Sequence, residues 1–318
     1  MTEQQQQIKP VDGAFKWPAR ESPHPENLAL ASKLCTALLP KGSDTKTITK
    51  HFPCGWSSND VIQVSIPSPA HQRRFVVKLP RRQTSSCIAA SCRAEALRTC
   101  WAAKHGFGPK VLAIHEESGG FVMEFIQGQT LTTEMIRQRL PQAVNMLRRI
   151  HEAEAMNWMR RYDPMEIVKE HLERVKQRNA MRPKDVGFVE GIIRDTGEEV
   201  KGHPWMPCHN DFHSHNVMLR RGSRDDSDCL LAIDFEDCDL GDPMWDLAYL
   251  TVNLELEQEP YPLEHLYGAS AEDRRRVRAY VPLAMAHCAT WAALHGGLWA
   301  QHQKEVMERL RKLVGDLS

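Results

Sequence analysis

The chain has 318 residues, enough for about two domains, and its 42% hydrophobic and 26% charged residues are the composition of an ordinary globular protein. Its 41 basic and 41 acidic residues cancel, so we expect neither nucleic acid nor an anionic membrane as a partner. The sequence has no transmembrane run and no export signal, which predicts a cytoplasmic protein. The nine cysteines include no C-x-x-C pair and are predicted to be reduced.

The first part of the chain is predicted to be rich in strands. Residues 1–26 lack an apolar period, which predicts a mobile tail, and residues 27–126 are predicted to form an N-terminal nucleotide-binding lobe. The spacing of apolar and turn residues predicts, in order, a helix over 27–39, strands over 47–52, 61–66 and 74–79, a helix over 91–105, and strands over 110–115 and 120–125.

Residues 127–318 are predicted to form a C-terminal catalytic and acceptor-binding lobe. Apolar residues there recur with the helical period of about 3.6 residues. This period predicts helices over 141–151, 165–178, 188–199, 273–298 and 301–317, and two short apolar runs predict strands over 217–219 and 230–233. The predicted fold class is therefore α+β.

Polar residues with a chemical pattern surround these two short runs. His209, Asp211 and Asn216 form the pattern H-x-D-x-x-x-x-N before the first run, and the second run leads into Asp234. In phosphoryl transfer one carboxylate orients the attacking hydroxyl and accepts its proton, while a second carboxylate and an amide oxygen bind Mg²⁺. Asp211, Asp234 and Asn216 match these three roles, and the catalytic loop of protein kinases has the same spacing.

A site of this kind also needs a lysine on the nucleotide phosphates and a glutamate that holds the lysine. Lys78 lies near the end of a predicted strand, and Glu95 lies one turn into the following predicted helix. Glu124 and Ile126 end the strand-rich part, where a hinge would present backbone groups to adenine. The order of these residues along the chain fits a kinase.

The turn between the first two predicted strands is a candidate phosphate loop. Gly55, Ser57, Ser58 and Asn59 lie in this turn, whose hydroxyl and amide groups can bind phosphate oxygens. The turn does not have the G-x-G-x-x-G pattern of protein kinases, so by itself it does not identify a nucleotide site.

From about residue 50 to 300 these motifs together resemble the aminoglycoside phosphotransferase and choline kinase superfamily, most nearly its choline/ethanolamine kinase-like branch. The run D-F-E at 234–236, followed by G-D-P-M-W-D-L-A at 241–248, is typical of its small-molecule kinases, and the A-P-E motif of protein kinases is missing. The resemblance implies a protein-kinase-like two-lobed fold with an antiparallel β N-lobe, a mainly helical C-lobe and ATP held between the lobes.

The resemblance also implies an ATP- and Mg²⁺-dependent kinase that phosphorylates a hydroxyl group of a small, amine-bearing metabolite of the choline or ethanolamine kind. We expect a monomer or homodimer, with His209 supporting the loop and Asp246 holding it. His213, Glu236, Asp246 and Trp291 are grouped as candidate acceptor-side residues. Trp291 resembles a choline kinase tryptophan, expected on one helix with Trp299, but His213 replaces the glutamine that choline kinases tend to have.

Three alternatives stay open from the sequence. The acidic run over 254–259 would suit a cationic antibiotic, so an aminoglycoside or other antibiotic O-phosphotransferase is the first alternative. His213 and His215 match the histidine pair of some zinc hydrolases, which is the second. The third is a catalytically silent pseudokinase that binds nucleotide.

Overall fold

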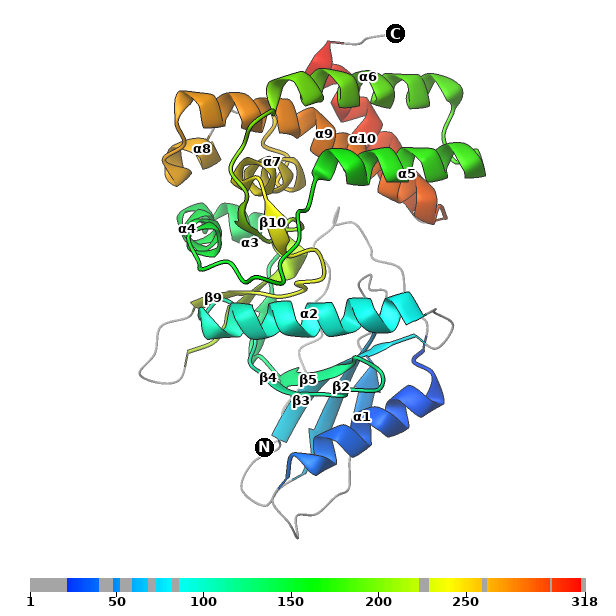
Figure 1. Cartoon of the computed structure of the whole chain (residues 1–318), viewed down its shortest axis with the longest axis vertical. Coiled ribbons are helices and arrows are strands. Elements are labelled where there is room, and N and C mark those ends of the chain that lie inside the picture. Colours follow the sequence, from blue (N-terminus) through cyan, green and yellow to red (C-terminus); the bar gives the residue numbers. More distant parts are fainter. Residues whose placement is uncertain are drawn as a thin grey trace, which may run out of the picture.

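The strand-rich and helix-rich parts of the chain form the two lobes that the resemblance implies (Figure 1). The computed structural model describes residues 22–39, 48–51, 59–67, 73–81, 86–222, 229–258, 262–297 and 299–315. The lower lobe in Figure 1 contains the main sheet, and the upper lobe contains most of the helices. No described helix is long and apolar enough to cross a membrane.

The main sheet of the lower lobe has five antiparallel strands in the order β1-β2-β3-β5-β4. Its strands are β1 (Ile48–His51), β2 (Asn59–Ile66), β3 (Arg73–Pro80), β4 (Val111–Ile114) and β5 (Phe121–Glu124). These bounds confirm the strands that alternating apolar residues predict, including the meander formed by the first three.

The two faces of this sheet are covered by different helices. Phe75 and Val77 of β3 pack with the residues of α1 (Pro25–Ala37), whereas Val76 belongs to the cluster that contains buried residues of α2 (Ser86–Lys104). Successive strand residues point to opposite faces, so Lys78 lies on the α2 side. The far end of α2 joins the core of the upper lobe through Trp101.

The upper lobe is built around the long helix α9, which packs against α5, α6, α7 and α10. Its helices are α3 (Thr133–Arg137), α4 (Leu140–His151), α5 (Pro164–Arg178), α6 (Pro183–Glu199), α7 (Pro243–Asn253), α8 (Pro262–Tyr267), α9 (Ala271–His295) and α10 (Trp299–Val314). The middle of α9 is apolar on most sides, which is what a helix surrounded by other helices requires.

Two small sheets lie between the lobes and position the candidate site. The strands are β6 (Gly128–Thr130), β7 (Met206–Cys208), β8 (Val217–Arg220), β9 (Cys229–Ala232) and β10 (Asp239–Gly241). They pair in the orders β6-β8-β9 and β10-β7. Because both sheets join segments far apart in the sequence, they bring the two motif-bearing loops together.

Local sequence signals set several helix ends. Asp163 and Asp242 each accept a hydrogen bond from a backbone N–H in the first turn of α5 and α7, and both helices have proline at the start. Ser270 and Asp273 form a reciprocal capping box at the start of α9. These polar groups satisfy backbone donors that would otherwise lack a partner.

The structure corrects two predicted boundaries. The single helix predicted over 273–298 is wrong, because α9 ends at His295, and Gly296 and Gly297 follow with φ of 55° and 54°, where the chain turns. Trp291 and Trp299 therefore lie on different helices. The first helix begins at Pro25, inside the predicted tail, whose residues 1–21 lie outside the described part of the chain.

Gly128 lies where β6 approaches β8 closely. A Cβ atom at this position would lie 2.0 Å from the carbonyl oxygen of Leu219. We expect Gly128→Ala to lower the free energy of unfolding by about 1–3 kcal/mol, because the backbone must move to relieve the overlap. Urea denaturation would measure this change.

Gly187 in α6 is the matched control, since a Cβ atom there meets nothing within 4 Å. Gly187→Ala should leave stability unchanged or raise it by up to about 1 kcal/mol, as alanine favours a helix. Equal stability of the Gly128→Ala variant and the unmodified protein would contradict this account.

Candidate active site

Asp211 and Asn216, predicted to share a loop, contact each other directly. Asp211 follows β7, and Asn216 ends a single 3₁₀ turn over Ser214–Asn216. The Asn216 Nδ2 donates to Asp211 Oδ2 at 2.7 Å and to the Asp211 carbonyl oxygen at 3.0 Å. Both side chains are therefore fixed at one edge of the loop.

The Asp211 carboxylate is also contacted by residues outside the motif. The His213 Nε2 lies 3.5 Å from Asp211 Oδ2, and Tyr249 on α7 lies close enough to the same carboxylate to lower its pKa. Burial alone would raise the pKa of Asp211, but His213, His209 and Tyr249 favour the ionised form and bring it down to about 2. Asp211 is thus an ionised carboxylate at neutral pH.

Asp246 holds the loop that carries Asp211, as predicted. Its two oxygens accept hydrogen bonds from the backbone N–H groups of His209 (2.9 Å) and Asn210 (2.7 Å). Asn210 has φ of 64°, and the Trp245 indole donates to its carbonyl oxygen at 3.1 Å. Asp246 is completely buried, and its place among the acceptor-side residues stays a prediction.

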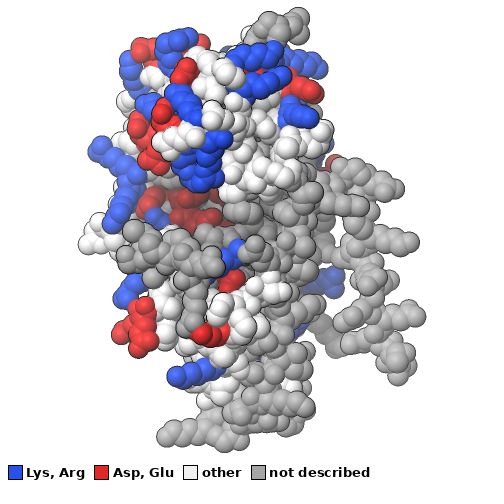
Figure 2. Space-filling view, turned by 90° about the vertical axis from the view of Figure 1, so that its right-hand side faces the viewer, with Lys and Arg blue, Asp and Glu red and all other residues white. Residues whose placement is uncertain are grey.

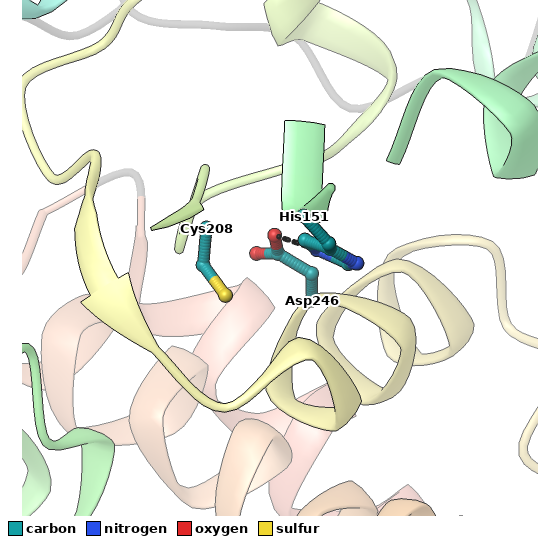
Figure 3. Close-up of side chains that lie close together, drawn as sticks. All are labelled: His151, Cys208 and Asp246. Atoms are coloured by element: carbon teal, nitrogen blue, oxygen red, sulfur yellow. Dashed lines mark hydrogen bonds and ion pairs between the residues drawn. The ribbon is translucent and has the colours of Figure 1, made fainter. Parts of the chain in front are cut away.

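His151 lies behind Asp246 and was not identified from the sequence as part of the site (Figure 3). Its Nε2 lies 3.0 Å from Asp246 Oδ2, and its Nδ1 lies 2.8 Å from the Tyr267 hydroxyl. Cys208 Sγ is the third ligand-type atom of this buried cluster. Because backbone N–H groups already occupy both Asp246 oxygens, the cluster supports the loop.

His209 supports the loop from its other side. Its ring packs against the rings of Phe212 and Phe235, and its Nε2 lies 3.1 Å from the Ile233 carbonyl oxygen. Burial lowers the pKa of His209, so the ring is neutral at neutral pH. With no exposed surface, the side chain positions Asp211 and does not touch a reacting atom.

Lys78, Glu95 and Asp234 meet between the lobes. The Lys78 ammonium contacts Glu95 Oε1 and lies 2.7 Å from Asp234 Oδ1, although Lys78 and Asp234 are 156 residues apart. Burial would lower the pKa of Lys78, but the charges of Asp234 and Glu95 raise it, so the ammonium stays charged. Asn59 Nδ2 donates to the other Glu95 oxygen at 3.2 Å.

Glu236 joins Glu95 and Asp234 in a group of carboxylates whose ligand atoms all lie within 4.8 Å of one another. Burial is the main cause that raises the pKa of Glu236, and the charges of Asp234 and Glu95 add to it. Hard oxygen ligands of this kind suit Mg²⁺, so the donor set fits the implied metal. Figure 2 shows acidic side chains gathered where the two lobes meet.

Only some of the residues predicted to bind the nucleotide lie in the described part of the chain. Gly55, Ser57 and Ser58 lie outside the described residues, and Asn59 contacts Glu95 at the start of β2. Ile126 is buried.

The Glu124 side chain is turned to partners within the chain. It accepts a hydrogen bond from the Lys110 backbone and lies 2.7 Å from the Arg220 guanidinium. Only the backbone of Glu124 would therefore be left to meet a nucleotide.

Two other groups of residues, the His213–His215 pair and the surroundings of Trp291, differ from what the sequence predicts. The rings of His213 and His215 lie 5.7 Å apart, but neither residue belongs to a cluster of three or more metal-binding side chains within the described chain. Trp291 packs against Trp299 and His295 at centroid distances of 4.7 and 4.1 Å.

Tyr249 and His151 are the principal site residues that the sequence did not single out. Tyr249 lies three residues after Asp246 on α7, so both face the Asp211 loop from one side of this helix. That spacing is the signal from which Tyr249 was identifiable. His151 ends α4, and only the tertiary structure brings it to Asp246.

A protein of similar sequence matches part of the chain. Protein LicA of Haemophilus influenzae is 23% identical over 191 residues, which cover 58% of this chain and, in two versions of that relative, 54% and 68% of its length. The chain thus spans only about half the length of the first of these relatives.

The structural neighbours share the fold at low sequence identity. The choline kinase LicA of Streptococcus pneumoniae superposes with TM-score 0.69, 18% identity and coverage of 91% and 99% of the two chains. The corresponding values are 0.67, 20%, 90% and 95% for a choline/ethanolamine kinase family protein of Mesorhizobium loti. An aminoglycoside phosphotransferase of Streptomyces rimosus gives 0.53, 18%, 82% and 98%.

The model of the phosphotransferase enzyme family matches residues 53–280, which include parts of both lobes, the Lys78–Asp234 contact and the Asp211–Asn216 pair. This match covers well over half of the chain. The protein belongs to the phosphotransferase enzyme family.

Proposed function

We propose that this chain is a small-molecule kinase that uses ATP and Mg²⁺ to phosphorylate a hydroxyl group of a small, amine-bearing acceptor of the choline or ethanolamine kind. The observation that carries the proposal is the meeting of Lys78 with Asp234 between the lobes, together with the Asp211–Asn216 pair. The choline kinase neighbours and the LicA relative support the choice of acceptor class. We place the lobe boundary between residues 126 and 127.

In the proposed mechanism Asp211 orients the acceptor hydroxyl and accepts its proton as the oxygen forms a bond to the γ-phosphorus and the bond to the leaving ADP oxygen breaks. Lys78 binds the α and β phosphates, and Glu95 positions Lys78. Asn216 and Asp234 would hold Mg²⁺, with Glu236 close by. When bound, the metal neutralises charge on the phosphates.

The contacts made by glutamates of the acidic run over 254–259 bear on the choice between the two acceptor classes. Glu257 forms two contacts with the Arg309 guanidinium, at 2.7 and 2.8 Å, and Glu255 lies 3.6 Å from it. This pairing engages Glu257, so the aminoglycoside alternative loses one of the carboxylates on which it rests. The zinc hydrolase alternative lacks a third ligand beside His213 and His215 among the described residues.

Asp211→Asn is the first test of the proposal. Removing the proton acceptor should lower kcat by about 10²- to 10⁴-fold while the ATP dissociation constant stays the same, because the carboxylate acts mainly in the transition state. Acceptor-dependent ADP release, with choline, ethanolamine and aminoglycosides as acceptors, measures turnover. The exposed Asp195, changed in the same way, is the control.

Unchanged turnover in Asp211→Asn would remove Asp211 from the mechanism. ATP binding without transfer to any acceptor in the unmodified protein would favour the pseudokinase alternative.

Asp234→Ala tests the metal and nucleotide side. The variant loses a carboxylate proposed to hold Mg²⁺ and a partner of Lys78, so ATP affinity in the presence of Mg²⁺ should fall by at least about tenfold. Titration calorimetry with and without Mg²⁺ would measure it. A normal affinity in Mg²⁺ would count against the assignment, and Asp211→Asn provides the folded control.

His213→Gln tests the electrostatic contact with Asp211. Since His213 helps to keep the pKa of Asp211 at about 2, its removal should raise that pKa. Protonated Asp211 cannot accept a proton, so the acid limb of kcat should move to higher pH. A kcat profile from about pH 4 to 8 checks this, with the exposed His265→Gln as control. An unmoved acid limb would show that His213 has no such influence.

A further inference from the structure

A line of rings runs from Asp211 into the helical lobe. Tyr249 lies beside Asp211, and its ring centroid lies 5.7 Å from that of His287 on α9. The His287 ring in turn lies 5.1 Å from that of His171 on α5. The two imidazoles therefore follow directly behind the side chain that contacts the candidate base.

Both imidazoles have a nitrogen that is not used within the chain. The Nδ1 atoms of His287 and His171 are buried and have no hydrogen-bond partner among the described residues. A buried polar atom without a partner costs about 1–3 kcal/mol, and here two such atoms belong to neighbouring rings, so a ligand that donated to both would remove that cost. The two Nδ1 atoms belong to side chains on facing helices, so neither helix capping nor a turn explains why they lack partners.

The two rings are uncharged at neutral pH. Burial is the main cause that lowers the pKa of His287 to about 4 and that of His171 to about 3. The neighbouring Arg174 and His295 lower the pKa of His171 further, and Asp211 is the one described carboxylate whose charge acts on His287. A neutral imidazole with its proton on Nε2 accepts a hydrogen bond at Nδ1.

We propose that His287 and His171 recognise the head of the acceptor through these two Nδ1 atoms, so that the acceptor carries N–H or O–H donors there. A primary ammonium group can donate to both nitrogens. A trimethylammonium group has no N–H and would leave both nitrogens buried without partners, which disfavours it. This inference rests on the proposed kinase function and names the residues that set its choice of acceptor.

Ethanolamine and choline form a matched pair of probes, because they share the hydroxyethyl group and differ only in the methylation of nitrogen. We expect kcat/KM for ethanolamine to exceed that for choline by at least about tenfold. In His287→Phe the preference should disappear, with a higher KM for ethanolamine and an unchanged value for choline. His287→Asn, which keeps a polar atom near the Nδ1 position, should restore part of it.

His105→Phe is the control. The Nε2 atom of His105 is also buried without a partner among the described residues, but its ring packs against Trp101 and Phe107 beside α2. The preference for ethanolamine should stay the same in this variant. If His287→Phe does not fold, judged by circular dichroism, His171→Phe and His287→Asn give the same comparison.

Two outcomes would overturn the inference and are distinguishable. The first outcome is an equal kcat/KM for choline and ethanolamine, or an equal loss of kcat/KM for both acceptors in the His287 and His171 variants. This outcome would reject the role of the two histidines and leave the kinase proposal standing. Transfer of phosphate to neither amino alcohol, with Asp211→Asn as the blank, would reject the proposed acceptor class and the inference together.

Discussion

The carboxylate of Asp246 fixes the part of the chain on which the candidate site depends. It accepts backbone N–H groups from His209 and Asn210, holding Asn210 in a left-handed conformation that side chains seldom adopt. Hydrogen bonds to a buried charge contribute about 1.5–3 kcal/mol each, enough to offset that strain. Asp211 follows immediately, so its position comes from Asp246 and from His151 behind it.

The second constraint is electrostatic and joins the lobes. Lys78 comes from the sheet, whereas Asp234 comes from the loop after β9, and their contact links the two lobes. Three carboxylates gather near this one lysine, and their mutual repulsion adds to burial in raising the pKa of Glu236. A divalent cation bound to a nucleotide phosphate would relieve that repulsion, in agreement with the family to which the chain belongs.

The residues proposed for the reaction and those proposed for acceptor choice differ in how far the sequence reveals them. Asp211, Asn216, Asp234, Lys78 and Glu95 could be predicted because each follows a local pattern, a fixed spacing or a strand and helix end. Tyr249, His287 and His171 have no such pattern, since they meet only when α5, α7 and α9 pack together. Glu236 and Asp246 were recognised, but their contacts place them with the metal-side carboxylates and beneath the loop.

The sequence by itself determined the strands of the main sheet, most of the longer helices and the phosphoryl-transfer motif, because apolar periodicity and motif spacing are local properties of the chain, whereas it did not predict α7, which carries Asp246 and Tyr249. Only the tertiary structure decided where α9 ends, where the short strands β6, β7 and β10 form, and which partners each buried polar group contacts. Those features depend on pairing and packing between residues distant in sequence, whose energies no local pattern records.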